Sequence, residues 1–172
     1  MYKEEEEVQL FENVRTGEKI QRGAVQDNEI VYDGKMLIVE TDTDGIITYA
    51  NRSTREILDY TKEELEGVPF IISIHPDMPE GICKEAFKVA NEGNVWSGYV
   101  QSITKNGEFF WTTTCVQAKF GMDKNIQGYI IRKKFAEDQI IEMVKEEYAQ
   151  LKDMKVGEYS SEYCRALQFK NY

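Results

Sequence analysis

Hydrophobic and polar residues alternate with different periods along the chain. Residues 36–41 and 46–49 are rich in β-branched side chains, which favour strands. The Asp42–Gly45 segment between them is typical of a tight turn, because Asp caps turn amides and Gly tolerates positive φ. The pattern therefore predicts an antiparallel hairpin.

Signals for short helices follow this hairpin. Asn51 is a candidate N-cap, and Thr61 with Glu64 three residues later has the spacing of a capping box. Residues 80–91 carry apolar side chains at helical spacing, and Gly93 is suited to end that helix. We expect several short helices in series.

Beyond residue 95 the period changes to two. Residues 96–104 and 108–120 flank Lys105-Asn106-Gly107, and an Asn-Gly pair between alternating segments indicates a hairpin. Residues 126–135 predict a final strand. Two strands, short helices and three strands indicate an α+β fold, with a five-stranded antiparallel sheet and the helices on one face.

The two ends of the chain have different patterns from the middle. Residues 1–30 predict an acidic N-terminal arm, helical or partly disordered, with a candidate short helix over 4–11, and residues 31–135 predict the folded α+β domain. Residues 136–172 predict a C-terminal amphipathic helix and tail. On that helix Ile140, Val144, Tyr148 and Leu151 are expected to share an apolar face, which either packs on the chain's own sheet or, as an exposed stripe, docks on a receptor or on a second copy in a homodimer.

Charge and composition exclude several classes of protein. The formal net charge is -10, and Arg132-Lys133-Lys134 is the one basic cluster in the sequence, so nucleic-acid binding is not expected. The acidic start is unlike a signal peptide, and the short apolar runs predict no membrane insertion. Three dispersed cysteines predict neither a zinc site nor a disulfide framework. We expect a cytoplasmic protein.

Particular words in the sequence carry a family resemblance. Residues 42–51, DTDGIITYAN, resemble the opening hairpin of PAS domains, and residues 60–67, YTKEELEG, resemble the word that follows it. Asp59 stands where that family usually has Gly. The resemblance covers about residues 36–135 and implies the PAS fold of a sensor in signal transduction.

A narrower resemblance involves His75-Pro76-Asp77-Met78-Pro79 together with Trp96-Ser97-Gly98 and Trp111. This set is similar to the PAS domain of aerotaxis receptors and to the stand-alone PAS partner of bipartite energy-taxis systems. The resemblance implies a flavoprotein that binds FAD and reports redox or energy state to a chemotaxis receptor or kinase. Ile74 stands where those relatives have Arg, and Gln101–Thr104, including Ile103, replaces a basic segment.

We expect the ligand cavity between the sheet and the helices. By period two, Phe110, Thr112, Thr114 and Val116 share the face that lines it. The predicted cofactor-binding residues are Asn51, His75, Asp77, Trp96, Thr112 and Thr114.

Alternatives stay open at this point. His75 is the sole histidine of the sequence and could contact a flavin, ligate haem iron or close a proline-rich turn. A haem-binding gas sensor and a cofactor-free interaction or dimerisation module are therefore alternatives to FAD binding. The sequence has no phosphate loop, paired-metal spacing or nucleophile–base set, so an enzyme is not expected.

Overall fold

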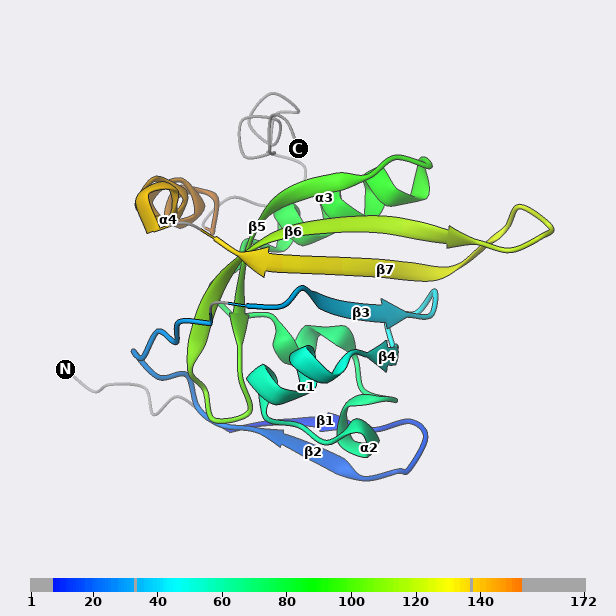
Figure 1. Ribbon diagram of the computed structural model, residues 1–172, viewed down its shortest axis with the longest axis horizontal. Helices are drawn as coiled ribbons and strands as arrows, with labels where there is room; N and C mark the ends of the chain where they lie inside the picture. Colours follow the sequence, from blue (N-terminus) through cyan, green and yellow to red (C-terminus); the bar gives the residue numbers. More distant parts are fainter. Residues whose placement is uncertain (1–7, 33, 137, 153–172) are drawn as a thin grey trace.

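Five antiparallel strands form the central sheet of the computed structural model, which describes residues 8–32, 34–136 and 138–152. Their order across the sheet is β4-β3-β7-β6-β5 (Figure 1). The strands are β3 (Leu37–Thr41), β4 (Ile47–Ala50), β5 (Trp96–Ile103), β6 (Phe109–Phe120) and β7 (Ile126–Phe135). The predicted α+β class and antiparallel sheet are confirmed.

Helices cover the two faces of this sheet unequally. Between β4 and β5 the chain forms α1 (Arg52–Leu58), α2 (Lys62–Leu65), the 3-10 helix η1 (Phe70–Ser73) and α3 (Glu80–Asn91). Phe87 of α3 packs edge-on against Tyr129 of β7, with ring centroids 4.9 Å apart. We call the face that these helices cover the inner face and the opposite one the outer face.

The predicted turn and caps are all present. Asp42 Oδ1 accepts hydrogen bonds from the amides of Asp44 and Ile46, which fixes the turn before β4. Asn51 accepts from the Thr54 amide and begins α1. The reciprocal bonds of the capping box begin α2 at Thr61.

The N-terminal segment forms a hairpin, so the helix predicted over 4–11 is wrong for its described part. Strands β1 (Gln9–Glu12) and β2 (Lys19–Arg22) pair antiparallel, with Phe11 opposite Ile20. Gly17 takes φ +76° in the connecting turn, and its amide donates to the Asn13 carbonyl. The turn signal in Arg15-Thr16-Gly17 therefore outweighs the weak helical pattern of the charged residues before it.

The hairpin lies beside α2 (Figure 1), and Asn13 and Arg22 dock it onto the rest of the molecule. The Asn13 side chain is fully buried, and its Nδ2 donates to the carbonyls of Glu63, Glu64 and Glu66. Arg22 Nη1 donates to carbonyls of η1 and of the residue after it, those of Ile71, Ile72 and Ile74.

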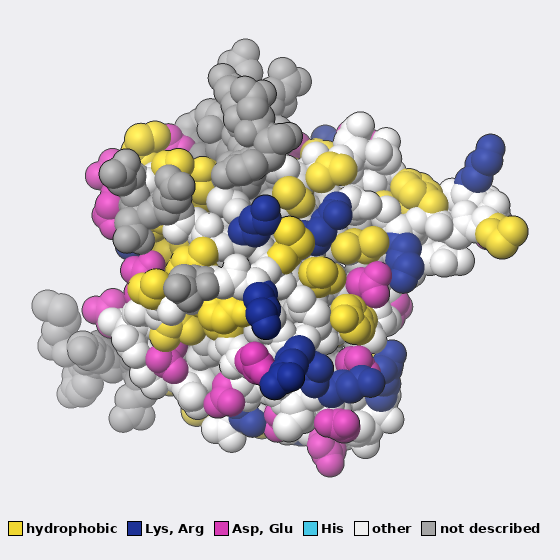
Figure 2. Space-filling model, in the orientation of Figure 1, with side chains coloured by type: hydrophobic (Ala, Val, Ile, Leu, Met, Phe, Trp, Pro, Cys, Tyr) yellow, Lys and Arg dark blue, Asp and Glu magenta, His cyan; other side chains and the backbone are white. Residues whose placement is uncertain are grey.

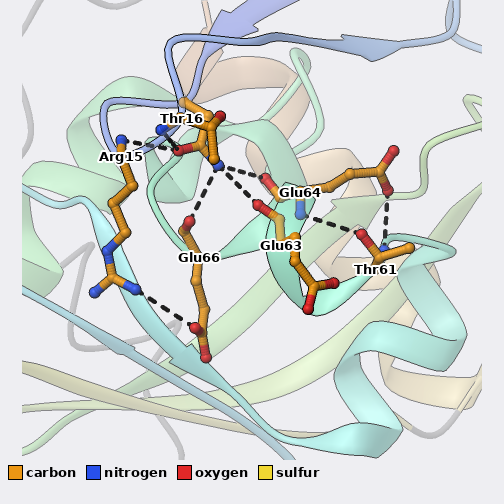
Figure 3. Close-up of polar contacts among 7 residues, drawn as sticks. Arg15, Thr16, Thr61, Glu63, Glu64 and Glu66 are labelled. Carbon is orange, nitrogen blue, oxygen red and sulfur yellow. Dashed lines mark hydrogen bonds and ion pairs between the residues drawn. The ribbon is translucent and has the colours of Figure 1, made fainter.

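Figure 3 shows the polar contacts around the end of α2. The amides of Arg15 and Thr16 donate to Asn13 Oδ1, and the Arg15 guanidinium lies 3.4 Å from the Glu66 carboxylate. Carbonyls at a helix end need such partners when they are buried. The described part of the predicted N-terminal arm therefore lies against the domain, where it covers α2 and η1.

The C-terminal helix α4 (Asp138–Lys152) packs on the outer face (Figure 1). Its buried residues are Ile141, Val144, Tyr148 and Leu151, whereas Ile140 is 39% exposed. Positions 141, 144, 148 and 151 lie at helical spacing on one face of α4, and Ile141 rather than Ile140 belongs to the buried face. The predicted exposed stripe is therefore wrong, because this face of the helix packs against the chain's own sheet.

The outer face carries mixed side chains where α4 does not cover it. Figure 2 shows hydrophobic side chains interspersed with acidic and basic ones on the side of the molecule drawn there. Within the described ranges, no helix combines the length and the apolar character that crossing a membrane requires.

Candidate functional site

The register of the sheet lines up a buried row of residues on the inner face. Gly98 of β5 pairs with Thr114 of β6, and Thr114 pairs with Lys133 of β7. Lys133 in turn pairs with Leu37 of β3. Because directly paired residues in an antiparallel sheet point to the same face, this row places a lysine in the interior.

Lys133 is the charged member of this row. The residue is 4% exposed, and its Nζ atom lies 3.1 Å from Ser102 Oγ and 5.6 Å from the centroid of the Phe70 ring. Burial lowers the pKa of Lys133 from 10.5 to about 8, and only the negative charge of an ionised Cys83 would oppose this shift. No carboxylate in the described part of the chain lies within ion-pair distance of Nζ.

Two threonine hydroxyls lie on the same inner face. Thr112 and Thr114 are buried, and their Oγ1 atoms are 2.9 Å apart. Thr112 Oγ1 also donates to the Val100 carbonyl over a longer distance of 3.4 Å. The predicted inward direction of both threonines is confirmed. Together with Ser102 and Lys133 they form what we call the inner-face polar cluster.

Aromatic side chains lie close to the polar cluster. The buried Trp96 ring lies over Gly98, where an added Cβ would be 2.4 Å from ring atoms. A larger residue in place of Gly98 would therefore displace the ring from Thr114's row. From the helical layer, Phe70 and Phe87 pack edge-on with ring centroids 6.0 Å apart.

Cys83 of α3 contributes a thiol on the helical side of the interior. Burial raises its pKa to about 11, although the charge of Lys133 partly opposes this effect. The thiol is therefore neutral at physiological pH and is a poor nucleophile.

His75 and Asp77 lie on a different side of the sheet. The buried His75 ring packs edge-on against Phe109 at 5.9 Å, and Phe109 alternates with the inward-facing Phe110. The Asp77 amide donates to His75 Nδ1 at 3.0 Å, so this nitrogen acts as an acceptor. The Asp77 carboxylate lies 3.9 Å from the same nitrogen.

Asp77 borders a hollow on the outer face rather than the polar cluster. The residues that line this hollow are Asp27, Asp77, Gln101, Phe109, Trp111, Lys145, Tyr148 and Ala149. Trp111 and Tyr148 also contact each other, with ring centroids 5.9 Å apart. The hollow thus lies between β5, β6 and α4.

The Asn51 side chain is occupied by structural contacts. Its Oδ1 accepts from the amides of Ile38 and Thr54, and its Nδ2 donates to the Met36 carbonyl. These bonds fasten the start of α1 to β3. They confirm the predicted cap. Contact between Asn51 and a ligand stays a prediction.

The structure divides the predicted site residues into three places. It brings Trp96, Thr112 and Thr114 together on the inner face, sets His75 and Asp77 beside the outer-face hollow, and uses Asn51 as a cap. It also places Ser102 and Lys133 on the inner face, two residues that the sequence prediction did not include. The alternation of Ile131, Lys133 and Phe135 was the available signal, but the basic triplet obscured it.

Comparison with known proteins gives the family. Residues 47–130 match the model of the PAS fold. The chain is 32% identical to the aerotaxis receptor of Escherichia coli over 126 residues, which is 73% of this chain and 25% of the receptor. The match therefore spans about a quarter of the receptor's length.

Solved structures agree on the fold. The PAS domain of a Colwellia psychrerythraea protein is similar with a TM-score of 0.54 and 25% identity, over 59% of this chain and 86% of that one. The dark structure of the blue-light photoreceptor Aureochrome1 LOV has a TM-score of 0.57 at 18% identity, over 71% of this chain and 99% of that one. The chain belongs to the PAS family and is homologous to the PAS region of the E. coli aerotaxis receptor.

Proposed function

We propose that this protein is a cytoplasmic sensor that holds a small planar cofactor, FAD, between the inner face and the helices. In this proposal the redox or energy state of the cofactor is passed by protein contact to a chemotaxis receptor or kinase. The observation that carries the proposal is the inner-face polar cluster, a buried ammonium group and three hydroxyls in an apolar interior.

The inner-face polar cluster suits the ring system of a flavin. One edge of an isoalloxazine presents carbonyl oxygens and ring nitrogens that accept hydrogen bonds, and the rest of the ring is apolar. Lys133 and the hydroxyls of Ser102 and Thr112 are donors for such an edge. Trp96, Phe70 and Phe87 offer aromatic contacts for the ring faces. A bound flavin would supply reversible electron transfer.

The diphosphate of FAD has weaker support from the chain's own residues. Ile74 occupies the position where the resembling receptors have Arg, and diphosphates favour arginine or amide donors. Arg22 brings a guanidinium to this region, but its Nη1 is engaged by the carbonyls of Ile71, Ile72 and Ile74. Similarity to the aerotaxis receptor is therefore the reason to propose FAD in particular.

A path for the output runs from the interior to α4. Strand β5 carries Ser102 on the inner face, and the carbonyl of Tyr99 on the same strand accepts a 2.7 Å hydrogen bond from the Tyr148 hydroxyl. A ligand that shifts β5 would therefore change the docking of α4. We propose that α4 passes this change to the partner.

A cofactor-free interaction module is the second candidate. Its support is that members of the polar cluster bond to one another, Lys133 to Ser102 and Thr112 to Thr114. A haem sensor has less support, because Nδ1 of His75 accepts the Asp77 amide and the ring packs on Phe109.

The absorption spectrum of the purified full-length protein, before and after incubation with FAD and gel filtration, tests the proposal. We expect flavin bands that stay with the protein, and chromatography of the heat-released cofactor should identify FAD. A haem spectrum would contradict FAD. Protein that stays colourless after incubation would leave the cofactor-free module.

A further inference from the structure

We infer that the interior selects organic anions, so that the group a ligand presents to Lys133 carries negative charge and its body is aromatic or apolar. This inference rests on the proposed ligand-binding function and narrows the class of ligand. It concerns a residue that lies outside the predicted set of cofactor-binding residues.

The first step is the missing counter-charge around Lys133. From β5 it meets the neutral hydroxyl of Ser102, and from η1 the ring of Phe70. Its partners across the sheet are Thr114 and Leu37, which carry no charge. A buried ammonium that lacks a carboxylate keeps most of its desolvation cost, so an anionic ligand gains by supplying the missing charge.

The helical layer does not supply that charge either. Cys83 of α3 interacts electrostatically with Lys133, and burial raises the pKa of Cys83 to about 11. The Glu80 side chain at the start of α3 is 73% exposed and lies 3.0 Å from the Lys84 ammonium. At neutral pH the interior therefore carries an uncompensated positive charge.

The interior around Lys133 indicates the body of the ligand. Phe70 lies over the ammonium, Phe87 packs edge-on against Phe70, and Trp96 and Val100 are buried on the same face of β5. Such walls favour apolar and aromatic surfaces. Inorganic phosphate or a small hydrated anion would offer these aromatic side chains no apolar surface to pack against. An aromatic anion therefore fits the surroundings better.

Two fluorescent probes with the same aromatic skeleton separate charge from shape. Anilinonaphthalene sulfonate carries a sulfonate, and phenyl-naphthylamine lacks it. We propose fluorescence titrations of both with the full-length wild type, Lys133→Met and Lys133→Arg. Lys134→Met is the matched control, because Lys134 is the next residue of β7 and is exposed.

We expect Lys133→Met to weaken sulfonate binding about tenfold and to change binding of the neutral probe less than about twofold. Lys133→Arg should keep the preference for the sulfonate, and Lys134→Met should change neither probe. The sulfonate affinity of the wild type should also fall above about pH 8, where Lys133 loses its proton, but not in Lys133→Met.

Three results would overturn the inference. If Lys133→Met weakens both probes equally, the lysine shapes the interior and does not select charge. If it weakens neither, the probes bind elsewhere and Lys133 is no anchor; both results leave the proposed FAD binding standing. If the wild type binds neither probe and also fails to retain FAD, the ligand-binding function itself fails with the inference. Circular dichroism of each variant confirms that the fold is kept.

Discussion

Lys133 Nζ and Ser102 Oγ are 3.1 Å apart inside the sheet, and they join β7 to β5 across β6. Each of these two strands is attached to α4 in a different way. Strand β7 leads into α4, and the Tyr99 carbonyl of β5 binds Tyr148 of that helix. A ligand that draws Lys133 away from Ser102 would therefore alter both attachments of α4 at once. Sensing and output would then depend on one buried contact.

The pH dependence of stability should report the buried Lys133. Its pKa is about 8 in the folded protein and near 10.5 when unfolded, so between these values the unfolded chain binds more protons. Unfolding then becomes less favourable as pH rises from about 8 to 10.5, by on the order of 3 kcal/mol in total. Urea unfolding of wild type and Lys133→Met at several pH values measures this term as a difference.

The comparison with Lys133→Met is needed because Cys83 acts in the opposite direction. Its pKa is raised from 9.0 to about 11, so the folded protein holds this proton longer and stability falls over that range. Lys133→Met removes the Lys133 contribution, which raises stability with pH, and leaves the Cys83 contribution, which lowers it. Identical pH profiles for the two proteins would show that Lys133 is not buried as described.

Asn13 should contribute strongly to stability through its contacts with α2. Replacement with Ala removes three side-chain donor bonds to the carbonyls of Glu63, Glu64 and Glu66 and leaves these groups without that partner. We expect Asn13→Ala to lower the free energy of unfolding by about 2–3 kcal/mol in urea titrations. Asn28→Ala, which removes one exposed bond to Glu108, is the control and should cost below about 0.5 kcal/mol. Equal losses would mean that the hairpin is not docked by Asn13.

Tyr148 should control how firmly α4 is held. Tyr148→Phe keeps the ring that packs on Trp111 and removes the hydroxyl that donates to the Tyr99 carbonyl. We expect a loss of about 1 kcal/mol and faster amide hydrogen exchange in α4, while the exchange of β3 stays unchanged. Met143→Ala, at an exposed position of α4, is the control. Unchanged exchange in α4 would show that this bond does not hold the helix.

Local signals in the sequence predicted much of the fold correctly. The Asp42 turn, the Asn51 cap and the Thr61–Glu64 box depend on contacts within a few residues, so their motifs are sufficient. The inward direction of Thr112 and Thr114 followed from the two-residue period of a strand, which needs no knowledge of the partner strands.

Long-range contacts could not be predicted in the same way. Asn13 and Arg22 lie in a weakly patterned segment, and their partners are carbonyls about fifty residues away, which carry no side-chain signal. The family resemblance predicts His75 beside the threonines, but the position of its ring depends on how the loop pairs with β5. The His75 amide donates to the Gln101 carbonyl, and this contact sets the ring beside Phe109.

The last prediction compares His75, which the sequence motif predicts to bind the cofactor, with Lys133, which the structure places on the inner face. In protein loaded with FAD, Lys133→Met should weaken flavin retention after gel filtration, because it removes the buried donor of the inner-face polar cluster. His75→Asn should leave retention nearly unchanged, since an Asn oxygen can still accept the Asp77 amide and the His75 ring lies beside Phe109. A loss of one charge-assisted bond corresponds to about tenfold in affinity. Lys124→Ala, on the exposed turn between β6 and β7, is the control. If His75→Asn releases the flavin and Lys133→Met retains it, the cofactor lies toward the outer-face hollow, as the sequence motif that contains His75 would then indicate.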